Sequence, residues 1–436
     1  MFSKNHLHIL RLAIPIILAN ASVPLLGLAD TAAIGQTAGA AELGAIALAA
    51  LIFSFVYWGF GFLRMGTTGF ISQAIGAKDT DETHALLFRS VLLGGGIGLA
   101  LIILQPLIGL GAVSFLNASD QIRALVLDYF YIRIWGAPAT LITFALLGTF
   151  IGAGWPRPLL IVQLFLNGLN ILLNVWFVVG LDFGVKGIAM GTLIAEWSTL
   201  FFAGYLLLRK MNFGPVLQRF RQLRERVFDK EKLLSLLRVN ADIMIRTLAL
   251  LFGFAWFANQ GAAFGDTILA GNHVLLQFVS LSAFFLDGYA HVVEMLAGKS
   301  YGAGNKKEFS RQVRHSTQLA GVTALLLAVG VYAFSDFLIP MLSQDLAVQQ
   351  VASTHRLYAA IYIALSFVAF QLDGVFIGVT KSREMRNATV MALLLFIGSG
   401  MWLASAYGNA GLWVGFIIYI VGRAAMLGYY YPRIMR

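Results

Sequence analysis

One carboxylate stands inside the first long apolar segment of the chain. Asp30 lies in LRLAIPIILANASVPLLGLADTAAIG, fifteen residues (30 − 15) after Pro15. A carboxylate at membrane depth costs free energy and is usually kept for ion coupling or substrate binding. An interior proline removes a backbone hydrogen bond and gives a helix a place to bend. Together, Pro15 and Asp30 predict a helix that bends differently when one acid is charged and when it is neutral. The simpler alternative is a hydrated carboxylate near a helix end.

A second set of polar residues recurs with the period of a helix. Gln163, Asn167, Asn170 and Asn174 are spaced by four, three and four positions, so all four lie on one helical face. Amide side chains commonly bridge neighbouring helices in membranes, at about 0.6–2 kcal/mol each. The same stripe would also line a polar chamber. Both interpretations stay open at this point.

A third set contains titratable groups. Asp287, His291 and Glu294 are four and three positions apart and share one helical face. Three ligands from a single helix would be an unusual geometry for a metal, so we expect no metal site. A proton or cation site is one alternative, and a buried network with partners such as Arg64 is the other.

Further along, Asp242 and Arg246 are four positions apart, which predicts an ion pair along one helix. Five other charged residues cannot be ranked from the sequence, and for each of them we expect an ion-pair partner rather than a catalytic role. They are Glu196, Asp128, Arg133, Arg356 and Asp373.

The elements that must position these residues are membrane-spanning helices. Hydrophobic residues make up 59% of the 436 residues and charged residues only 12%, and a spanning helix needs about 20 mostly apolar residues. Apolar runs separated by polar, Gly or Pro punctuation predict an all-α membrane protein with twelve helices. We expect them near 8–32, 43–70, 84–111, 121–147, 157–180, 187–209, 233–259, 267–295, 311–335, 348–373, 384–406 and 410–431.

The net charge of +10 follows the predicted topology. Lys and Arg gather in alternate loops, most densely between Arg209 and Arg238, whereas the intervening loops are mainly acidic. This positive-inside pattern places both termini in the cytoplasm and makes nucleic-acid binding unnecessary as an explanation. The first apolar segment is expected to be retained rather than removed as a signal peptide. The chain has no cysteine, which excludes disulfides and thiolate chemistry.

The sequence also repeats itself. GTFIGAGWPRP at 148–158 matches GVFIGVTKSRE at 374–384 (374 − 148 = 226), and AIGAKDTDE at 74–82 matches SYGAGNKKE at 300–308 at the same offset. GIAMG at 187–191 matches GLWVG at 411–415 at an offset of 224. We therefore expect two pseudo-symmetric six-helix lobes. Because six is even, the two lobes have the same orientation in the membrane.

These matches define the predicted domain organisation. Residues 1–208 form an N-lobe and residues 233–436 a C-lobe. The basic linker at 209–232 is partly amphipathic, and we expect it to lie along the cytoplasmic surface.

Twelve helices in two lobes, the Pro15 and Asp30 pair and the loop SQAIGAKD resemble the multidrug and toxic compound extrusion (MATE) family. VPLLGLADTAAIG at 23–35 and QLDGVFIGVTKSREMRN at 371–387 resemble its DinF-type branch in particular. The resemblance covers about residues 8 to 430. It implies a V-shaped pair of helical bundles around a central cleft. The activity it implies is export of amphipathic or cationic compounds, driven by inward proton or sodium flow.

The resemblance also assigns roles to single residues. Asp30 matches the acid that takes the coupling cation, and Pro15 matches the proline at which the first helix bends. Asn170, Asn174 and Thr192 match polar residues facing the same chamber. Many DinF-type relatives have an aspartate at the position of Asn174, so this chain has one acid fewer there, which favours protons over sodium. The acids that the NorM-type branch uses do not align with Asp373.

We therefore expect a proton-coupled antiporter of the bacterial inner membrane, working without a cofactor and without an enzymatic reaction. Its partners would be small amphipathic or cationic molecules and membrane lipid, with no nucleic acid, and the chain would act as a monomer. Sodium coupling and a flippase for lipid-linked substrates, from the same superfamily, are the alternatives. AGKS at 297–300 lacks the earlier glycine of a phosphate-binding loop, because position 293 is valine, which argues against ATP as the energy source.

Overall fold

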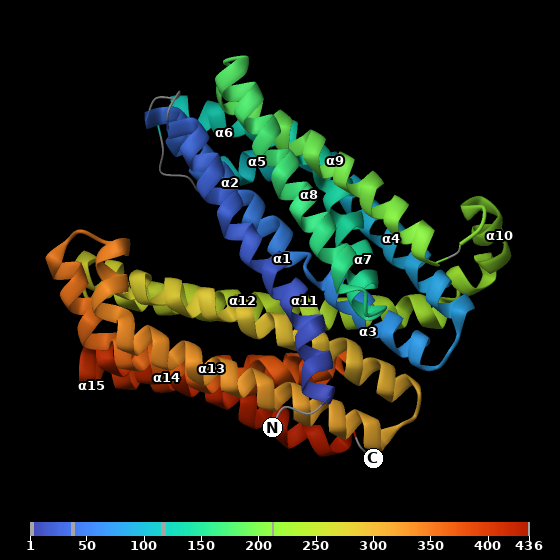
Figure 1. Ribbon diagram of the computed structural model, residues 1–436. Coiled ribbons are helices and arrows are strands. Elements are labelled where there is room, and N and C mark those ends of the chain that lie inside the picture. The colour runs from blue at the N-terminus through green and yellow to red at the C-terminus, as the bar shows by residue number, and fades with distance from the viewer. Residues whose placement is uncertain (1–3, 36–39, 115–118, 212, 435–436) are drawn as a thin grey trace. The chain divides into compact units, whose positions relative to one another are not determined.

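Every regular element that the computed structural model describes is a helix (Figure 1). The structure describes residues 4–35, 40–114, 119–211 and 213–434, and within them it does not describe the side chains of 23–35, 40, 41, 43, 55 and 113. The helices of the first half are α1 (Lys4–Gly35), α2 (Ala40–Gly59), α3 (Phe62–Gly76), α4 (Thr80–Ile103), α5 (Gln105–Ser114), α6 (Asp120–Arg133), α7 (Ala137–Gly152), α8 (Pro156–Val175) and α9 (Gly184–Met211). Those of the second half are α10 (Val216–Val227), α11 (Lys230–Ala263), α12 (Asp266–Gly302), α13 (Lys306–Leu342), α14 (Leu346–Gly378) and α15 (Ser382–Tyr430).

The all-α fold predicted from the apolar runs is confirmed. In the described part of the chain, 10 helical segments are long and apolar enough to cross a membrane. Three predicted helices consist of two shorter ones each, namely α2 with α3, α4 with α5 and α6 with α7. The last two predicted helices form α15, which is interrupted at Gly408, where φ is +59°. A positive φ is easily adopted by glycine, which explains why the turn between these two helices falls there.

The internal repeat recurs in the helix contacts. Gly148 of α7 and Gly374 of α14 are 226 positions apart, and each packs directly on another helix. A Cβ atom at Gly148 would lie 2.4 Å from the carbonyl oxygen of Arg64, and one at Gly374 would lie 2.4 Å from that of Ala290. Arg64 and Ala290 are themselves 226 positions apart. The duplicated sequence therefore places the same glycine at the same close helix crossing in both halves.

Contacts divide the chain into two compact units. The first consists of Met1–Ile17, Ser72–Lys78 and Leu237–Arg436. Its core lies among α11 to α15 and is rich in large aromatic side chains, including Phe257, Phe396, Trp413, Phe416 and Tyr419. Figure 1 shows α13, α14 and α15 running side by side within this unit.

The second unit consists of Leu18–Ile71 and Asp79–Leu236. Within it α4 packs on α7, and α9 packs on α6, α7 and α8. The boundary between Ile17 and Leu18 falls inside α1, two positions after Pro15. One continuous helix therefore belongs to both units. The lobe boundaries at 208 and 233 stay a prediction.

Candidate functional site

The amide stripe lies on α8, a helix that begins with Pro156 and runs directly into a π-helical turn at Trp176–Gly180. Proline suits the first turn of a helix, where its missing N–H is not needed. π-turns inside helices occur frequently at functional sites. Asn167, Asn170 and Asn174 are buried, at 6%, 1% and 1% exposure. The face predicted from the spacing is therefore the inner face of α8.

The amides of the stripe connect α8 to α9. The Asn174 Nδ2 donates to Asn170 Oδ1 at 2.9 Å, and the Asn170 Nδ2 donates to Thr192 Oγ1 at 2.9 Å. Thr192 belongs to α9 and is buried. The structure thus brings together the three polar residues that the family resemblance assigned to one chamber.

A glycine makes room for this arrangement. A Cβ atom on Gly191, in α9, would lie 2.2 Å from the Asn174 Oδ1. Real Cβ atoms do not approach an oxygen so closely, so any larger residue at 191 would displace the Asn174 amide. The packing of α9 is therefore part of the site.

The other half of the stripe connects α8 to α1. The Asn167 Nδ2 donates to Ser22 Oγ at 2.8 Å and to the Ser22 carbonyl oxygen at 3.1 Å. Gln163 in turn donates to Asn167 Oδ1 at 3.3 Å. Ser22 lies between Pro15 and Asp30 on α1. Hydrogen bonds therefore join α1, α8 and α9 through one face of α8, which is the bridging role that was one of the two interpretations of the stripe.

Two of the predicted residues are positioned by α1. The helix continues through Pro15 and Asp30 to Gly35. The side chain of Asp30 lies outside the described residues, so the predicted coupling acid is placed by its backbone alone. Close to Pro15, the side chain of Ile17 packs on Gly288 of α12, where a Cβ atom would lie 2.3 Å from Ile17 Cγ1. The two halves of α1 thus pack on different helices.

On α12, the predicted trio begins with Asp287, the residue just before Gly288. The His291 Nδ1 is 3.4 Å from Glu294 Oε2, and both side chains are buried. Within the described part of the chain, no three His, Cys, Asp or Glu side chains come close enough together to hold a metal ion. The structure therefore shows His291 and Glu294 as a buried pair, with Asp287 one turn before them.

The predicted ion pair between Asp242 and Arg246 is wrong. Asp242 accepts instead from Arg386 at 2.5 Å and from Ser382 at 2.9 Å, at the beginning of α15. Arg246 donates to the Oδ2 of Asp373 on α14. Leaving the buried acid on another helix without a cation would cost more free energy than losing the pair with an acid on the same helix.

Asp373 is held by two arginines, a feature that the sequence did not predict. Arg423 of α15 donates to the same Oδ2 at 2.5 Å, so two guanidinium groups share one carboxylate oxygen. Asp373, Arg423 and Arg246 are 4%, 5% and 9% exposed. Buried charges require partners, because an unpaired charge in a low-dielectric interior is costly.

A second buried ion pair lies in the other unit. Arg133, at the end of α6, is 3.7 Å from the Glu196 carboxylate of α9 and donates to the Tyr129 hydroxyl at 3.0 Å. Its guanidinium lies 4.6 Å from the ring centre of Phe53. Gly136 leaves space for the acid, because a Cβ atom there would lie 1.9 Å from Glu196 Oε2. The remaining unranked charges are paired as well, Asp128 with Lys186 and Arg356 with Asp336.

Comparisons with known proteins identify the class. The MatE family model matches residues 15–176 and 244–402, one match in each half of the chain. The solved outward-facing structure of a multidrug resistance MATE family transporter of the MOP superfamily has a TM-score of 0.86 and 20% identity, and covers 99% of this chain and 96% of that chain. MATE structures in a bent and in a straight conformation have TM-scores of 0.86 each at 21% and 20% identity, covering 100% and 99% of this chain and 98% and 96% of theirs. These structures show that the fold is that of MATE transporters, and the family model identifies the chain as a MATE transporter, which is a multi-pass membrane protein and not an enzyme.

The chain belongs to the MATE family. It is similar to DNA damage-inducible protein F of Escherichia coli, with 34% identity across 95% of this chain and 90% of that protein, which places it in the DinF-type branch. It is also similar to Protein DETOXIFICATION 44, chloroplastic, of Arabidopsis thaliana, with 28% identity across 96% and 81%. Multidrug resistance protein NorM of Vibrio cholerae is 23% identical across 98% and 95%.

Proposed function

We propose that this protein is a proton-coupled secondary antiporter that exports amphipathic and cationic compounds by alternating access, with Asp30 as the coupling acid. The observations that support this most directly are two sets of hydrogen bonds on one face of α8. One joins Asn167 to Ser22 of α1, and the other runs from Asn174 through Asn170 to Thr192 of α9. The helix that carries Asp30 is thereby bonded to the polar face of α8. A change in the charge of Asp30 would act on bonds that already connect three helices.

The donor set favours a proton over sodium. Asn170, Asn174 and Thr192 offer neutral amide and hydroxyl groups and no second carboxylate. A hard cation binds better as the number of oxygen ligands and negative charges around it rises. A proton needs only one acid, and Asp30 is the acid of this proposed site.

The conformational step depends on α1. Protonation would remove the charge of Asp30 and rearrange its bonds with Asn170, Asn174 and Thr192, and α1 would then bend at Pro15. Pro15 stands two positions before the point where α1 passes from one unit to the other. A bend there would change how the two halves of the helix are held. The fold is known in a bent and in a straight conformation.

Coupling further requires that proton and substrate favour opposite conformations, since a ligand shifts an equilibrium only by its differential affinity. Asp287, His291 and Glu294 are the secondary candidates for proton transfer, on α12. We infer that the protein acts as a monomer in a bacterial inner membrane, with both termini in the cytoplasm and membrane lipid around it.

The test is drug-induced collapse of ΔpH in everted membrane vesicles in sodium-free buffer. Wild type should respond, and Asp30→Asn should be silent at equal expression. A response that persists in Asp30→Asn would move the coupling site to Asp287 and Glu294. A response of wild type that needs added sodium would establish sodium coupling instead.

Asn174→Asp provides a matched variant of the same site. It introduces an acid of the same size next to Asn170, so it should shift the response towards sodium dependence while leaving the fold intact. An Asn174→Asp variant that remains independent of sodium would contradict the argument from the donor set.

A further inference from the structure

The linker between the two halves of the chain contains a helix with two different faces. One face of α10 packs on the beginning of α4. Leu223 and Val227 are 4% and 0% exposed and pack with Ala85, Phe88 and Phe220. A short amphipathic helix needs such an apolar contact to be stable, because helices of this length are marginal in water.

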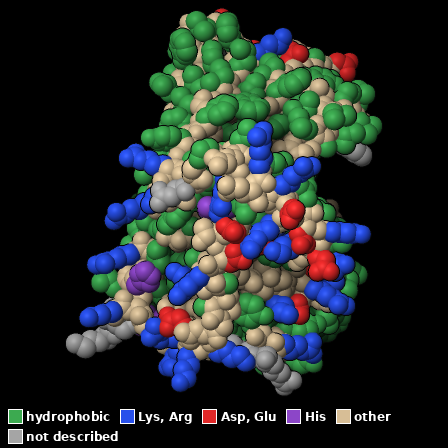
Figure 2. Space-filling view, turned by 90° about the vertical axis from the view of Figure 1, so that its right-hand side faces the viewer, with side chains coloured by type: hydrophobic (Ala, Val, Ile, Leu, Met, Phe, Trp, Pro, Cys, Tyr) green, Lys and Arg blue, Asp and Glu red, His purple; other side chains and the backbone are tan. Residues whose placement is uncertain are grey.

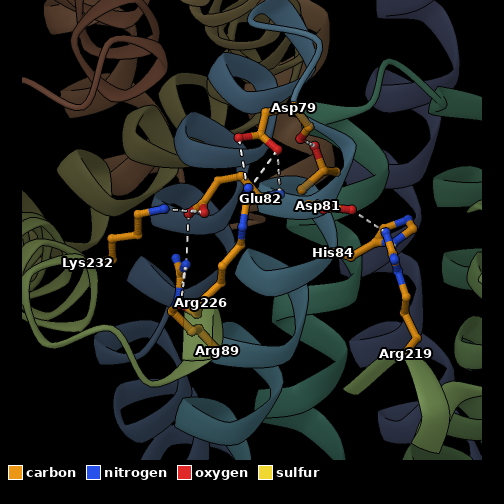
Figure 3. Close-up of polar contacts among 9 residues, drawn as sticks. Asp79, Asp81, Glu82, His84, Arg89, Arg219, Arg226 and Lys232 are labelled. Carbon is orange, nitrogen blue, oxygen red and sulfur yellow. Dashed lines mark hydrogen bonds and ion pairs between the residues drawn. The ribbon is translucent and has the colours of Figure 1, made fainter. Parts of the chain in front are cut away.

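Figure 3 shows the ion pairs around the start of α4, where α10 packs. Arg219 lies 2.5 Å from Asp81 and Arg226 lies 3.1 Å from Asp79. Glu82 joins Lys232 at 2.5 Å to Arg89 at 2.8 Å.

Arg89 also donates to the backbone oxygen of Arg226 at 2.9 Å, near the end of α10. The position of α10 on α4 is therefore fixed by apolar packing and by charge together.

A second face of α10 is exposed. Leu217, Arg221, Arg224 and Phe228 are spaced by four, three and four positions and lie on one side of the helix. Leu217 is 64% exposed and Phe228 is 54% exposed. We call these four residues the outer face of α10. Arginines and exposed apolar side chains together can make the two kinds of contact that an interfacial helix makes, with headgroup charges and with the adjoining acyl layer.

The location of this face agrees with that composition. α10 packs beside the first turns of α4, at Ala85 and Phe88. One turn further on, α4 begins to expose large apolar side chains, with Leu92 at 47%, Leu99 at 57% and Ile103 at 77%. In a membrane-spanning helix such a surface contacts lipid. α10 therefore lies beside the point where α4 passes from its polar end into the hydrocarbon layer.

The charge of α10 points to an anionic surface. Its sequence VLQRFRQLRERV contains four arginines and one acid, Glu225. Arg219 and Arg226 form ion pairs with Asp81 and Asp79 at the start of α4. Arg221 and Arg224 are exposed and point away from this contact. Lys and Arg side chains are spread over much of the molecular face seen in Figure 2, with a smaller group of Asp and Glu among them. Basic segments next to a membrane are attracted by the anionic lipids of its cytoplasmic leaflet.

We propose that the outer face of α10 binds anionic phospholipid, with Arg221 and Arg224 on the headgroup phosphates and Leu217 and Phe228 in the interfacial layer. The ion pairs of Arg226 with Asp79 and of Arg219 with Asp81 then fix the position of α4 relative to the membrane surface through α10. This inference rests on the membrane-spanning fold and not on the nature of the coupling ion.

The chain has no cysteine, which allows a single-site label. The full chain carrying Leu217→Cys is labelled with an environment-sensitive fluorophore and placed in nanodiscs of phosphatidylcholine, with and without phosphatidylglycerol. We expect a blue shift, and quenching by brominated lipid, only when phosphatidylglycerol is present. Arg221→Gln with Arg224→Gln should abolish the shift, and high salt should reduce it.

The control removes two exposed arginines from another helix, Arg311→Gln with Arg314→Gln on α13, and should leave the shift unchanged. No lipid-dependent shift in the labelled protein would overturn the proposal, as would equal loss in the control. A shift that appears only when poly-glutamate is added would overturn it in favour of an acidic protein partner. Because the label occupies position 217, Phe228→Ser tests the apolar part and should weaken the quenching by brominated lipid.

Discussion

Asp79 and Asn305 cap α4 and α13 in the same way, 226 positions apart. Asp79 Oδ1 accepts the backbone N–H of Glu82 at 2.9 Å, and Asn305 Oδ1 accepts that of Glu308 at 3.0 Å. The residues just before them, Lys78 and Gly304, both have a positive φ, of 59° and 66°. The repeat has thus kept the backbone turn and the cap while changing the capping residue from an acid to an amide.

This equivalence predicts how Asp79 can be replaced. Asp79→Asn should keep the cap, as Asn305 does, whereas Asp79→Ala should cost about 0.5–2 kcal/mol, the usual loss for an N-cap. Thermal unfolding of the purified protein in detergent would measure the difference. Equal losses for the two variants would show that the ion pair with Arg226, and not the cap, is what Asp79 contributes.

The same residue predicts a pH dependence. The pKa of the Asp79 carboxyl lies below its ordinary value because it accepts the Glu82 backbone N–H and, in addition, faces Arg226. A lowered pKa contributes stability that is present above the ordinary value for Asp, about 3.9, and lost as the pH falls through the folded value. Wild type should therefore lose more stability on acidification than Asp79→Asn, as unfolding temperatures across an acidic pH series would reveal. Parallel curves would contradict this.

Gly191→Ala adds only one methyl group, but we expect it to disturb the hydrogen bonds of Asn174. The new methyl group would stand 2.2 Å from the Asn174 Oδ1, so the amide must move and its bond to Asn170 must lengthen or break. Overpacking of this kind costs about 1–3 kcal/mol. We expect loss of drug-induced ΔpH collapse and a lower unfolding temperature.

Gly204, on the same helix, provides the control. A Cβ atom there would have nothing within 4 Å. Alanine is the better helix former by up to about 1 kcal/mol, so Gly204→Ala should be neutral or stabilising. If both alanine variants transport equally well, the close approach of α9 to Asn174 has no role in transport.

The bond between α1 and α8 can be measured by a double-mutant cycle. Ser22→Ala and Asn167→Ala each remove one side of the contact between Asn167 Nδ2 and Ser22 Oγ, which is 2.8 Å long. Hydrogen bonds between membrane helices contribute about 0.6–2 kcal/mol, so the coupling energy should fall in that range. Ser22→Ala keeps the Ser22 carbonyl as an acceptor for Asn167, whereas Asn167→Ala removes both bonds. Additive losses would show that the contact with Ser22 Oγ contributes no coupling energy, so that only the bond to the carbonyl connects the two helices here.

The parts of this structure that depend on local sequence could be predicted. The apolar runs identified the spanning helices, and the spacing of Asn167, Asn170 and Asn174 identified their common face, because both follow from the helical period. That Asn170, Asn174 and Thr192 face the same chamber was expected only from the family resemblance, and the bonds among them were not predicted. Ser22 was not predicted at all, since a serine in an apolar helix carries no signal of its partner 145 positions away.

Ion pairs were the least predictable feature. An i,i+4 pair such as Asp242 and Arg246 contributes about 0.2–0.5 kcal/mol. Asp373 is buried, and leaving it without a cation would cost several times more. Arg246 therefore pairs with an acid 127 positions away. Which acid Arg246 pairs with depends on how α11, α14 and α15 pack, and a single sequence does not reveal that packing.

That competition makes Asp373 a strong test of the buried network. Asp373→Ala would leave Arg246 and Arg423 facing each other in the interior without the acid that they share. Removing one partner of a buried ion pair costs about 3–5 kcal/mol, and thermal unfolding in detergent should show a loss of that size. Asp336→Ala is the control, because Asp336 pairs with Arg356 but its side chain is 74% exposed, so its loss should stay within about 1 kcal/mol.

A rescue variant separates charge from packing. Replacing all three residues at once, with Arg246→Met, Asp373→Leu and Arg423→Met, removes every buried charge and should recover most of the lost stability, because apolar side chains of similar volume can replace a buried ion network. A rescued protein that still fails to transport would give the three charges a role in the transport cycle. If Asp373→Ala is no less stable than Asp336→Ala, the two arginines do not depend on this carboxylate.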